Sequence, residues 1–298
     1  MPMHISFRLR PKDKRLLKAR VSLGPVEVDA IPREDLIERI VQDAFRAEST
    51  RVVATVNAQF YVLADGDSVF RDCLKRSEFT CADGFPIGIA ASLLAGHRIE
   101  RVAGVEIVEE ICRRGSRGGL RVFLLGGRPG SAAQLAALLT ERYPGLTIAG
   151  VACPPVGFEK CTQSLSAILG EVAAARPHVV FVALGAPKQE MFIDQYLRNL
   201  RIPIAVGVGG SFEIITGVTR RAPKLVQHVG MEWMYRLCQE PQRLWRRYLL
   251  GNPQFLWIMS RYFILGQEAM QAGHSSYAQG AKQLMRKGRP ATSHVPWN

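Results

Sequence analysis

The stretch HVVFVALGAPKQE, residues 178–190, decides the fold class. It begins with an apolar run of strand length, and residues 185–187 then interrupt it before the helical pattern Lys188–Leu200. Short apolar runs and longer amphipathic stretches alternate in the same way from Val26 to about Gly217. This alternation is typical of successive β-α units, so the sequence predicts an α/β fold with a mostly parallel sheet flanked by helices.

The same pattern predicts six strands and the helices between them. The expected strands are Arg51–Val56, Glu78–Cys81, Arg121–Leu125, Leu146–Val151, His178–Leu184 and Ile202–Val208. The expected helices are Ala58–Arg76, Phe85–Ala95, Val105–Arg114, Ser131–Tyr143, Leu165–Arg176 and Lys188–Leu200. Ligands of open α/β sheets gather where the strands end at their carboxyl side. The residues just after these strands are therefore the first candidates for a functional site.

The composition excludes several classes of protein. The longest apolar stretches, Ile89–Ala95 and Val179–Leu184, are far shorter than the roughly 18–20 residues of a membrane-spanning helix, and residues 1–20 lack a signal-peptide core. We therefore expect a cytoplasmic protein. The six cysteines form no C-x-x-C pair and the six histidines form no cluster with ligand spacing. We expect buried free thiols, with neither a disulfide framework nor a metal site.

Basic residues are concentrated at both ends of the chain. The net charge is +13, of which residues 1–24 contribute +6 and residues 201–298 contribute +9, so the body between them is near neutral. Such ends suit a polyanionic partner, which could be nucleic acid, an anionic membrane surface or a phosphorylated substrate. We expect four segments: a disordered basic extension at 1–24, an α/β catalytic domain at 25–216, a helical membrane-associating appendage at 217–266 and a disordered tail at 267–298.

The expected appendage is basic, aromatic and amphipathic. A helix that starts near Pro223 would carry one apolar stripe, made of Leu225, Val229, Trp233 and Leu237. A second helix would start at Pro241 and end at Gly251-Asn252-Pro253. Its spacing would place three cations on one face: Arg243, Arg246 and Arg247.

Asp83 follows a short expected strand and precedes Gly84 and a helix. Its carboxylate should project into the cleft, where it could accept a proton from an incoming hydroxyl as a general base. The residue alone is better explained as an N-cap of the following helix. The sequence pattern leaves both roles open.

Three further polar residues stand at strand ends. Thr55 and Asn57 alternate with Val56, so both side chains leave the same face of a buried strand and could bind sugar hydroxyls. Gln189 lies in the first turn of a helix opened by Pro187 and offers both a donor and an acceptor. Turn formation and helix capping are comparable explanations for all three.

Two other motifs carry less weight. The first βα turn, at residues 57–59, lacks the G-x-G-x-x-G pattern of dinucleotide-binding proteins, which disfavours an oxidoreductase. The glycine-rich junctions after Leu125 and Val206 could bind phosphate through backbone N–H groups, but they are weak signals by themselves. Asp65-Gly66-Asp67 has the form of a D-x-D metal motif, but it lies away from any expected strand end. We interpret it as a surface feature and expect no cofactor.

Taken in order, the motifs resemble those of the WecG/TagA/CpsF family, glycosyltransferase family 26. The resemblance covers roughly residues 25–260, and these segments carry it: 55–59, 82–84, 101–104, 185–190, 207–210, 221–223, 232–233, 236–237, 239–241, 243, 246–248 and 251–253. It implies a Rossmann-like catalytic body with a C-terminal helical appendage, a UDP-sugar donor, inversion at the anomeric carbon and a polyprenyl-diphosphate-linked sugar as acceptor. The extension before Val21 and the tail after about Gln267 have no counterpart in this pattern.

The resemblance also implies roles for individual residues. Asp83 becomes the expected base, and Thr55, Asn57 and Gln189 become lining residues of the substrate pocket. Glu213 stands where the family often has Asp near the nucleotide base, which implies a role in uracil binding. Cations become candidates to bind the diphosphate: Arg101, Arg220, Arg221, Arg243, Arg246 and Arg247. Because arginine can neutralise the charge on departing UDP, the resemblance further disfavours a metal requirement.

Two rival classes explain less of the sequence. A nucleic-acid-binding protein would use basic ends with interleaved aromatic residues, but the charge here lies on an amphipathic appendage and the body carries polar strand ends instead of a basic stripe. A non-catalytic membrane scaffold would leave Asp83 and Gln189 unexplained. The donor sugar, the polymer and the oligomeric state stay open, a homo-oligomer being one alternative.

Overall fold

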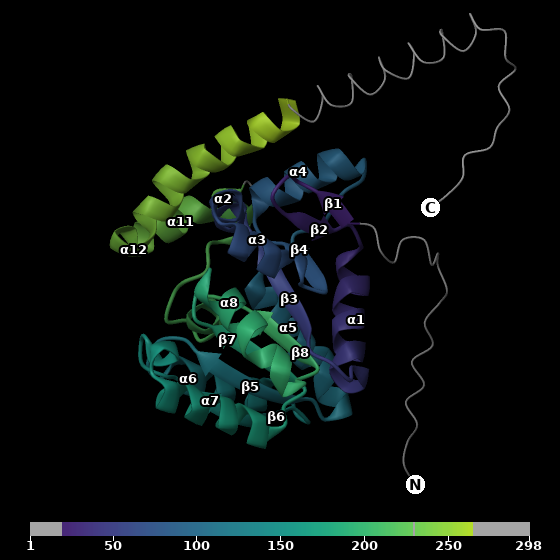
Figure 1. Ribbon diagram of the computed structural model, residues 1–298, viewed down its shortest axis with the longest axis vertical. Coiled ribbons are helices and arrows are strands. Elements are labelled where there is room, and N and C mark those ends of the chain that lie inside the picture. The colour runs from purple at the N-terminus through teal and green to yellow at the C-terminus, as the bar shows by residue number, and fades with distance from the viewer. Residues whose placement is uncertain (1–19, 229, 265–298) are drawn as a thin grey trace, which may run out of the picture. The chain divides into compact units, whose positions relative to one another are not determined.

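The computed structural model describes residues 20–228 and 230–264 (Figure 1). Contacts divide the chain into two compact units, Met1–Phe255 and Leu256–Asn298. Residues 1–19, where disorder is expected, and the expected tail 267–298 lie outside the described residues. Residues 20–24 of the expected extension are described, and they begin with strand β1.

The central sheet has six strands, and each neighbouring pair is parallel, in the order β4-β3-β8-β7-β5-β6 (Figure 1). The strands are β3 (Arg51–Val56), β4 (Phe79–Ala82), β5 (Arg121–Gly126), β6 (Thr147–Ala152), β7 (Val179–Ala183) and β8 (Ile204–Gly207). Each strand begins and ends within two residues of the limits expected from the sequence. The predicted α/β fold with a parallel sheet is confirmed.

Helices cover both faces of this sheet. Val122 and Leu124 of β5 pack into a cluster with α1 (Arg33–Arg46), α5 (Gly104–Gly115) and α6 (Ser131–Arg142). Phe123 and Leu125, which alternate with them, pack on the other face against α7 (Thr162–Ala175) and α8 (Lys188–Gln195). A strand buried on both faces reads as a continuous apolar run, which is why the sequence identified these strands well.

The expected helix Ala58–Arg76 is two helices, α2 (Ala58–Gly66) and α3 (Ser68–Lys75). The break occurs at Asp67, whose Oδ1 accepts hydrogen bonds from the backbone N–H groups of Val69 at 2.9 Å and Phe70 at 3.1 Å. Asp67 is thus the N-cap of α3. The motif Asp65-Gly66-Asp67 therefore has a structural explanation at a helix junction. In a similar way, Lys188–Leu200 divides into α8 and the 3₁₀ turn η4 (Leu197–Leu200).

The N-terminal elements were not predicted. Strands β1 (Arg20–Ser22) and β2 (Glu27–Asp29) form an antiparallel pair, and the helix α1 follows. Asp29 Oδ1 accepts from Arg20 Nε at 2.9 Å, and its Oδ2 accepts from the backbone N–H of Thr80 at 2.7 Å. This attaches the pair to β4. Strands of three residues are too short to show a period. Helix α1 does bury residues at helical spacing, so its sequence contained a usable signal.

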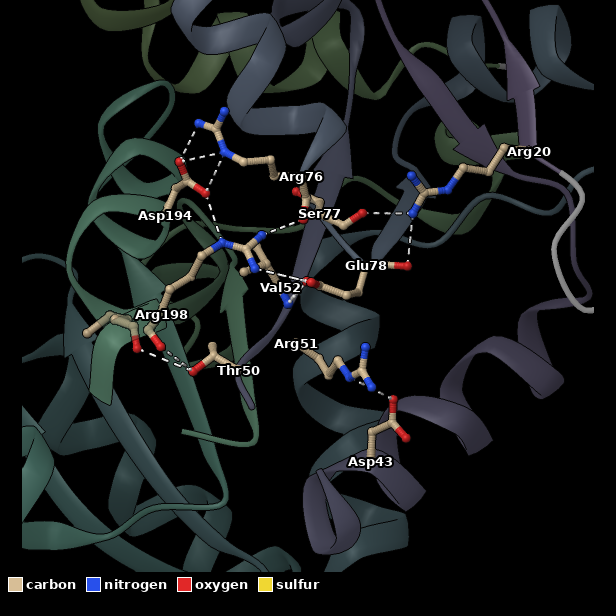
Figure 2. Close-up of polar contacts among 11 residues, drawn as sticks. Arg20, Asp43, Thr50, Arg51, Val52, Arg76, Ser77, Glu78, Asp194 and Arg198 are labelled. Atoms are coloured by element: carbon tan, nitrogen blue, oxygen red, sulfur yellow. Dashed lines mark hydrogen bonds and ion pairs between the residues drawn. The ribbon is translucent and has the colours of Figure 1, made fainter. Parts of the chain in front are cut away.

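A polar network fixes the start of β3 and β4 at the end of the sheet opposite their carboxyl ends (Figure 2). Glu78 accepts from the Val52 N–H at 2.8 Å and pairs with Arg198 of η4 at 3.1 Å. Arg198 also binds Asp194 at 2.8 Å and the carbonyl of Arg76. These contacts help to hold the β3–β4 register, in which Thr55 lies beside Cys81 and Val56 lies beside Ala82. The residues that follow both strands are thereby brought next to each other.

The appendage contains the short helices α10 (Lys224–His228), α11 (Glu232–Gln239) and α12 (Pro241–Trp245), the π-turn η5 (Arg246–Leu250) and helical residues 251–264. The expected single helix with a stripe from Leu225 to Leu237 is wrong because α10 ends before Gly230, whose φ is +75°, and Val229 lies outside the described residues. The expected stop at Gly251-Asn252-Pro253 is also wrong. Pro253 would clash with the carbonyl of Leu249 in a regular helix, and the π-turn before it relieves that clash.

Two other expectations concern cysteines and the membrane. All six cysteines are free. Cys73, Cys81 and Cys112 are buried as expected. The other three are exposed: Cys153 follows the end of β6, Cys161 is the N-cap residue of α7, and Cys238 lies on α11, a helix without buried residues. Within residues 20–228 and 230–264, none of the helices combines the length and the apolar character needed to span a bilayer.

Candidate active site

The carboxyl ends of four adjacent strands, β4, β3, β8 and β7, meet at a cavity of about 140 Å³. The body contributes the strand-end residues Thr55, Asn57, Asp83 and Gln189, and the backbone of 208–211. The appendage contributes four charged side chains: Arg221, Glu232, Arg236 and Arg247. The cavity lies where ligands bind in open parallel sheets, and it combines a carboxylate base candidate with several cations.

Asp83 comes directly after β4 and lies at the cavity wall. Its backbone N–H donates to the carbonyl of Val56 at 2.8 Å, which fixes the residue beside the end of β3. Gly84, with φ of +92°, is the N-cap of α4 (Phe85–Ala95), and no side-chain hydrogen bond caps that helix. The capping explanation of Asp83 is therefore wrong. Among the described residues, no hydrogen bond engages its carboxylate.

Burial, and to a smaller extent the carboxylate of Glu232, raise the pKa of Asp83 from 3.8 to about 6, against the opposing effect of Arg101, Arg247 and Arg236. At pH 7 the group is mostly ionised and yet more basic than an ordinary aspartate. A general base works best when its pKa is near the operating pH. Asp83 has the geometry and the electrostatic environment of such a base.

Thr55 and Asn57 both line the cavity and also stabilise the local fold. The Thr55 hydroxyl donates to the carbonyl of Gly207 at 3.1 Å, which joins β3 to β8. Asn57 Oδ1 caps α2 by accepting from the N–H groups of Gln59 at 3.0 Å and Phe60 at 3.2 Å. The capping explanation of Asn57 therefore holds, and its Nδ2 group forms no hydrogen bond to the described residues. That amide remains able to bind a substrate oxygen.

The side chain of Gln189 joins the loops that follow β7 and β8. Its Oε1 accepts from the N–H of Gly185 at 3.1 Å and from the N–H of Gly209 at 3.0 Å. The residue is 2% exposed and contacts the cavity. It holds the two loops together at the bottom of the site, and its amide nitrogen is left to other partners.

The appendage arginines divide into two groups. Arg221 and Arg247, both expected at the site, line the cavity, whereas Arg220 and Arg246 are exposed and do not line it. The side chain of Arg243 lies outside the described part of the structure. Arg246 instead stacks on Trp245, its guanidinium 5.2 Å from the ring centroid, so the expectation that Arg246 shares a face with Arg247 is wrong.

Arg101 lies in a neighbouring cavity of about 710 Å³, which Arg221 also lines. Its guanidinium binds Glu232 at 2.9 Å and Gln227 at 3.3 Å. Arg221 in turn pairs with Glu106 at 2.9 Å. These pairs join the appendage to the body beside the Asp83 cavity.

Glu213 is not among the residues that line the Asp83 cavity. It is 6% exposed, and its Oε1 accepts from the N–H of Arg128 at 2.7 Å and from the Ser131 hydroxyl at 3.2 Å. Those bonds hold the glycine-rich loop after β5 at the start of α6. A role in uracil binding stays a prediction, and it would have to operate through this loop.

Glu232 and Arg236 line the cavity but were not expected there from the sequence. They stand at i and i+4, so they share one face of α11, and that face lines the cavity. This spacing was a usable signal, but it was obscured because the helix was expected to start near Pro223. The structure therefore adds one carboxylate and one cation to the site.

Two comparisons with known proteins identify the family of this chain. The model of the family described as "Glycosyl transferase WecG/TagA/CpsF family" matches residues 21–269. The chain is also 32% identical over 205 residues, 68% of its length and 77% of the relative's, to the N-acetylglucosaminyldiphosphoundecaprenol N-acetyl-beta-D-mannosaminyltransferase of Bacillus subtilis (strain 168). The match covers the strands, the site and the appendage together, and this chain therefore belongs to the WecG/TagA/CpsF family of glycosyltransferases.

Proposed function

We propose that the protein transfers a sugar, with inversion, from a UDP-sugar to a polyprenyl-diphosphate-linked acceptor in cell-surface or exopolysaccharide biosynthesis. The name of the Bacillus subtilis relative, which specifies an N-acetylglucosaminyldiphosphoundecaprenol acceptor, supports the acceptor class. The observation that carries the proposal is the pairing of one basic carboxylate, Asp83, with the cations Arg221, Arg236 and Arg247 in one cavity.

The reaction would be a single displacement. Asp83 takes the proton of the acceptor hydroxyl while that oxygen forms a bond to the anomeric carbon of the donor sugar. The bond from that carbon to the UDP oxygen breaks on the opposite face, and UDP leaves with the electron pair. Cationic side chains of the appendage stabilise the charge that develops on the diphosphate. Attack on one face and departure from the other invert the anomeric configuration.

A lipid-linked acceptor fits the surface next to the site. Residues 84–101 contribute to the neighbouring cavity, which includes one side of α4 and the cation Arg101. The same helix exposes four apolar side chains: Phe85, Ile89, Leu93 and Leu94. An apolar surface beside cations suits a polyprenyl diphosphate. We therefore place the protein at the inner face of the cytoplasmic membrane as a peripheral protein, where basic side chains gain about 1 kcal/mol each near anionic lipid.

A transfer assay tests the proposal. Purified protein is incubated with a synthetic polyprenyl-diphosphate N-acetylglucosamine and one UDP-sugar at a time, and UDP release is measured. Release that depends on the acceptor, for one donor in the panel, is the expected result. If no donor gives acceptor-dependent release while the protein binds nucleic acid tightly, the glycosyltransferase proposal is wrong for this chain.

The pH dependence should report the ionisation of Asp83. Because the base acts only when it is deprotonated, kcat should rise about tenfold per pH unit below pH 6 and level off above it. Initial rates between pH 4.5 and 8 measure the midpoint. The residual rate of an Asp83→Asn variant should lack this acidic limb, and a wild-type midpoint near 4, the ordinary value, would contradict the assignment.

Divalent ions should not be required. Asp67 already caps α3, and the arginine side chains that line the Asp83 cavity could neutralise a diphosphate in place of a metal. Transfer in excess EDTA should therefore proceed within about twofold of the rate in Mg²⁺. Complete loss in EDTA with recovery in Mg²⁺ or Mn²⁺ would disprove this prediction.

A further inference from the structure

Glu190 is a buried carboxyl group next to the site that the proposed chemistry does not use. It is 2% exposed, and its Oε1 accepts a hydrogen bond from Gln189 Nε2 at 2.6 Å. Its Oε2 is buried with no hydrogen-bond partner among the described residues. A buried polar atom left without a partner costs stability, so its retention calls for a functional explanation.

The contacts around Gln189 fix the orientation of its amide. Its oxygen faces two backbone N–H donors, those of Gly185 and Gly209, and its nitrogen faces the Glu190 oxygen. The reverse orientation would direct the amide N–H groups at two donors. A Cβ at position 207 would lie 2.6 Å from Glu190 Oε1 and 2.7 Å from Gln189 Nε2, so a larger residue there would displace both side chains. With one N–H bound by Glu190, the amide has a single N–H left for a ligand.

We propose that Glu190 is a positioning residue, which holds the Gln189 amide so that its second N–H binds an oxygen atom of the sugar substrate in the Asp83 cavity. The inference rests on the proposed function. An N–H donor selects an oxygen acceptor, so the contact is to a sugar hydroxyl, an acetamido carbonyl or a phosphate oxygen. Glu190 itself does not touch the substrate.

The protonation state of Glu190 suits this role. Burial raises the pKa of Glu190 from 4.5 to about 8, so at pH 7 it is mainly the neutral acid. A neutral acid has one oxygen that accepts and one that carries a proton, which is the same pattern as a glutamine amide. Glutamine should therefore replace Glu190 with little loss, whereas methionine, of similar length, offers no comparable acceptor.

The test compares Glu190→Gln with Glu190→Met in the full-length protein. With donor and acceptor saturating, Glu190→Gln should keep kcat within about threefold of wild type, and Glu190→Met should lower kcat about 10–100-fold. Both variants should melt at or above the wild-type temperature at pH 7, because folding no longer has to neutralise a carboxyl group whose pKa is raised by burial. A merely structural Glu190 would instead lower the melting temperature of the Met variant and leave the kcat of its folded fraction unchanged.

A double-mutant cycle with Gln189→Ala separates positioning from an independent effect. If Glu190 acts through Gln189, adding Glu190→Met to Gln189→Ala should change kcat by less than about twofold. The inference would be overturned if the kcat of the double variant fell by the product of the two single losses. It would also be overturned if Glu190→Met alone kept the wild-type kcat. These outcomes require an active wild type, so they are distinct from failure of the proposed function, in which the wild type itself transfers no sugar.

Discussion

Replacing Asp83 with Asn is expected to lower the transfer rate by about 10²–10⁴-fold, the usual contribution of general base catalysis. The amide has nearly the shape of the carboxylate but cannot take the proton of the acceptor hydroxyl. Binding of UDP, measured by calorimetry, should change little because the cations of the cavity remain. Turnover within a few-fold of wild type would exclude Asp83 as the base.

The same substitution should stabilise the fold at neutral pH. Asp83 has a pKa of 3.8 as a free side chain and about 6 in the folded protein, so folding opposes its ionisation. Its contribution to the free energy of unfolding falls as pH rises from about 4 to 6, by about 1–3 kcal/mol, and stays low above that range. Asp83→Asn should recover this energy at pH 7.5 and give little gain near pH 4, as measured by urea unfolding.

Asp67 provides the matched control. Its carboxylate caps α3 and lies away from the Asp83 cavity, so Asp67→Ala should cost about 1 kcal/mol of stability and leave the transfer rate unchanged. Opposite effects of the two aspartates would show that one residue serves catalysis and the other serves the fold. If Asp83→Asn lost stability in the way Asp67→Ala does, the interpretation that burial destabilises the ionised form of Asp83 would be wrong.

The sheet could be predicted from the sequence because its strands are buried on both faces. Runs such as Val179–Ala183 have no polar interruption, and their limits are marked by turn residues. The N-terminal pair β1–β2 could not be predicted in the same way. Its strands have three residues each and are attached to β4 through Asp29, a contact across 51 positions in sequence that no local pattern contains.

The residues of the site likewise differ in whether the sequence could predict them. Thr55, Asn57, Asp83 and Gln189 were identifiable because the carboxyl ends of parallel strands meet at one edge of the sheet. The appendage residues depend on where each short helix begins and how it is rotated. The sequence pattern does not show where α10 ends and α11 begins, so it did not indicate that Glu232 and Arg236 lie on the face of α11 that lines the cavity.

Arg246 and Arg247 give the second large prediction because they are adjacent but lie in different surroundings. Arg247 lines the Asp83 cavity, whereas Arg246 is exposed and stacks on Trp245. Arg247→Gln should lower kcat by about 10²–10³-fold, the scale seen when one group that stabilises transition-state charge is removed. Arg246→Gln should leave kcat within a few-fold. The assay uses a short, water-soluble diphosphate-linked acceptor, so that membrane attachment does not affect the rate.

The Arg246→Gln and Arg247→Gln substitutions each remove one positive charge. In an assay with a lipid-linked acceptor in anionic vesicles, both variants should therefore lose a similar part of their vesicle binding, measured by sedimentation. The difference between them in the soluble assay then isolates the catalytic contribution of Arg247. Arg236→Gln should behave like Arg247→Gln, since Arg236 lines the same cavity from α11. Equal rates for the Arg246 and Arg247 variants with the soluble acceptor would mean that the appendage cations act only at the membrane, and that the diphosphate is neutralised by other groups.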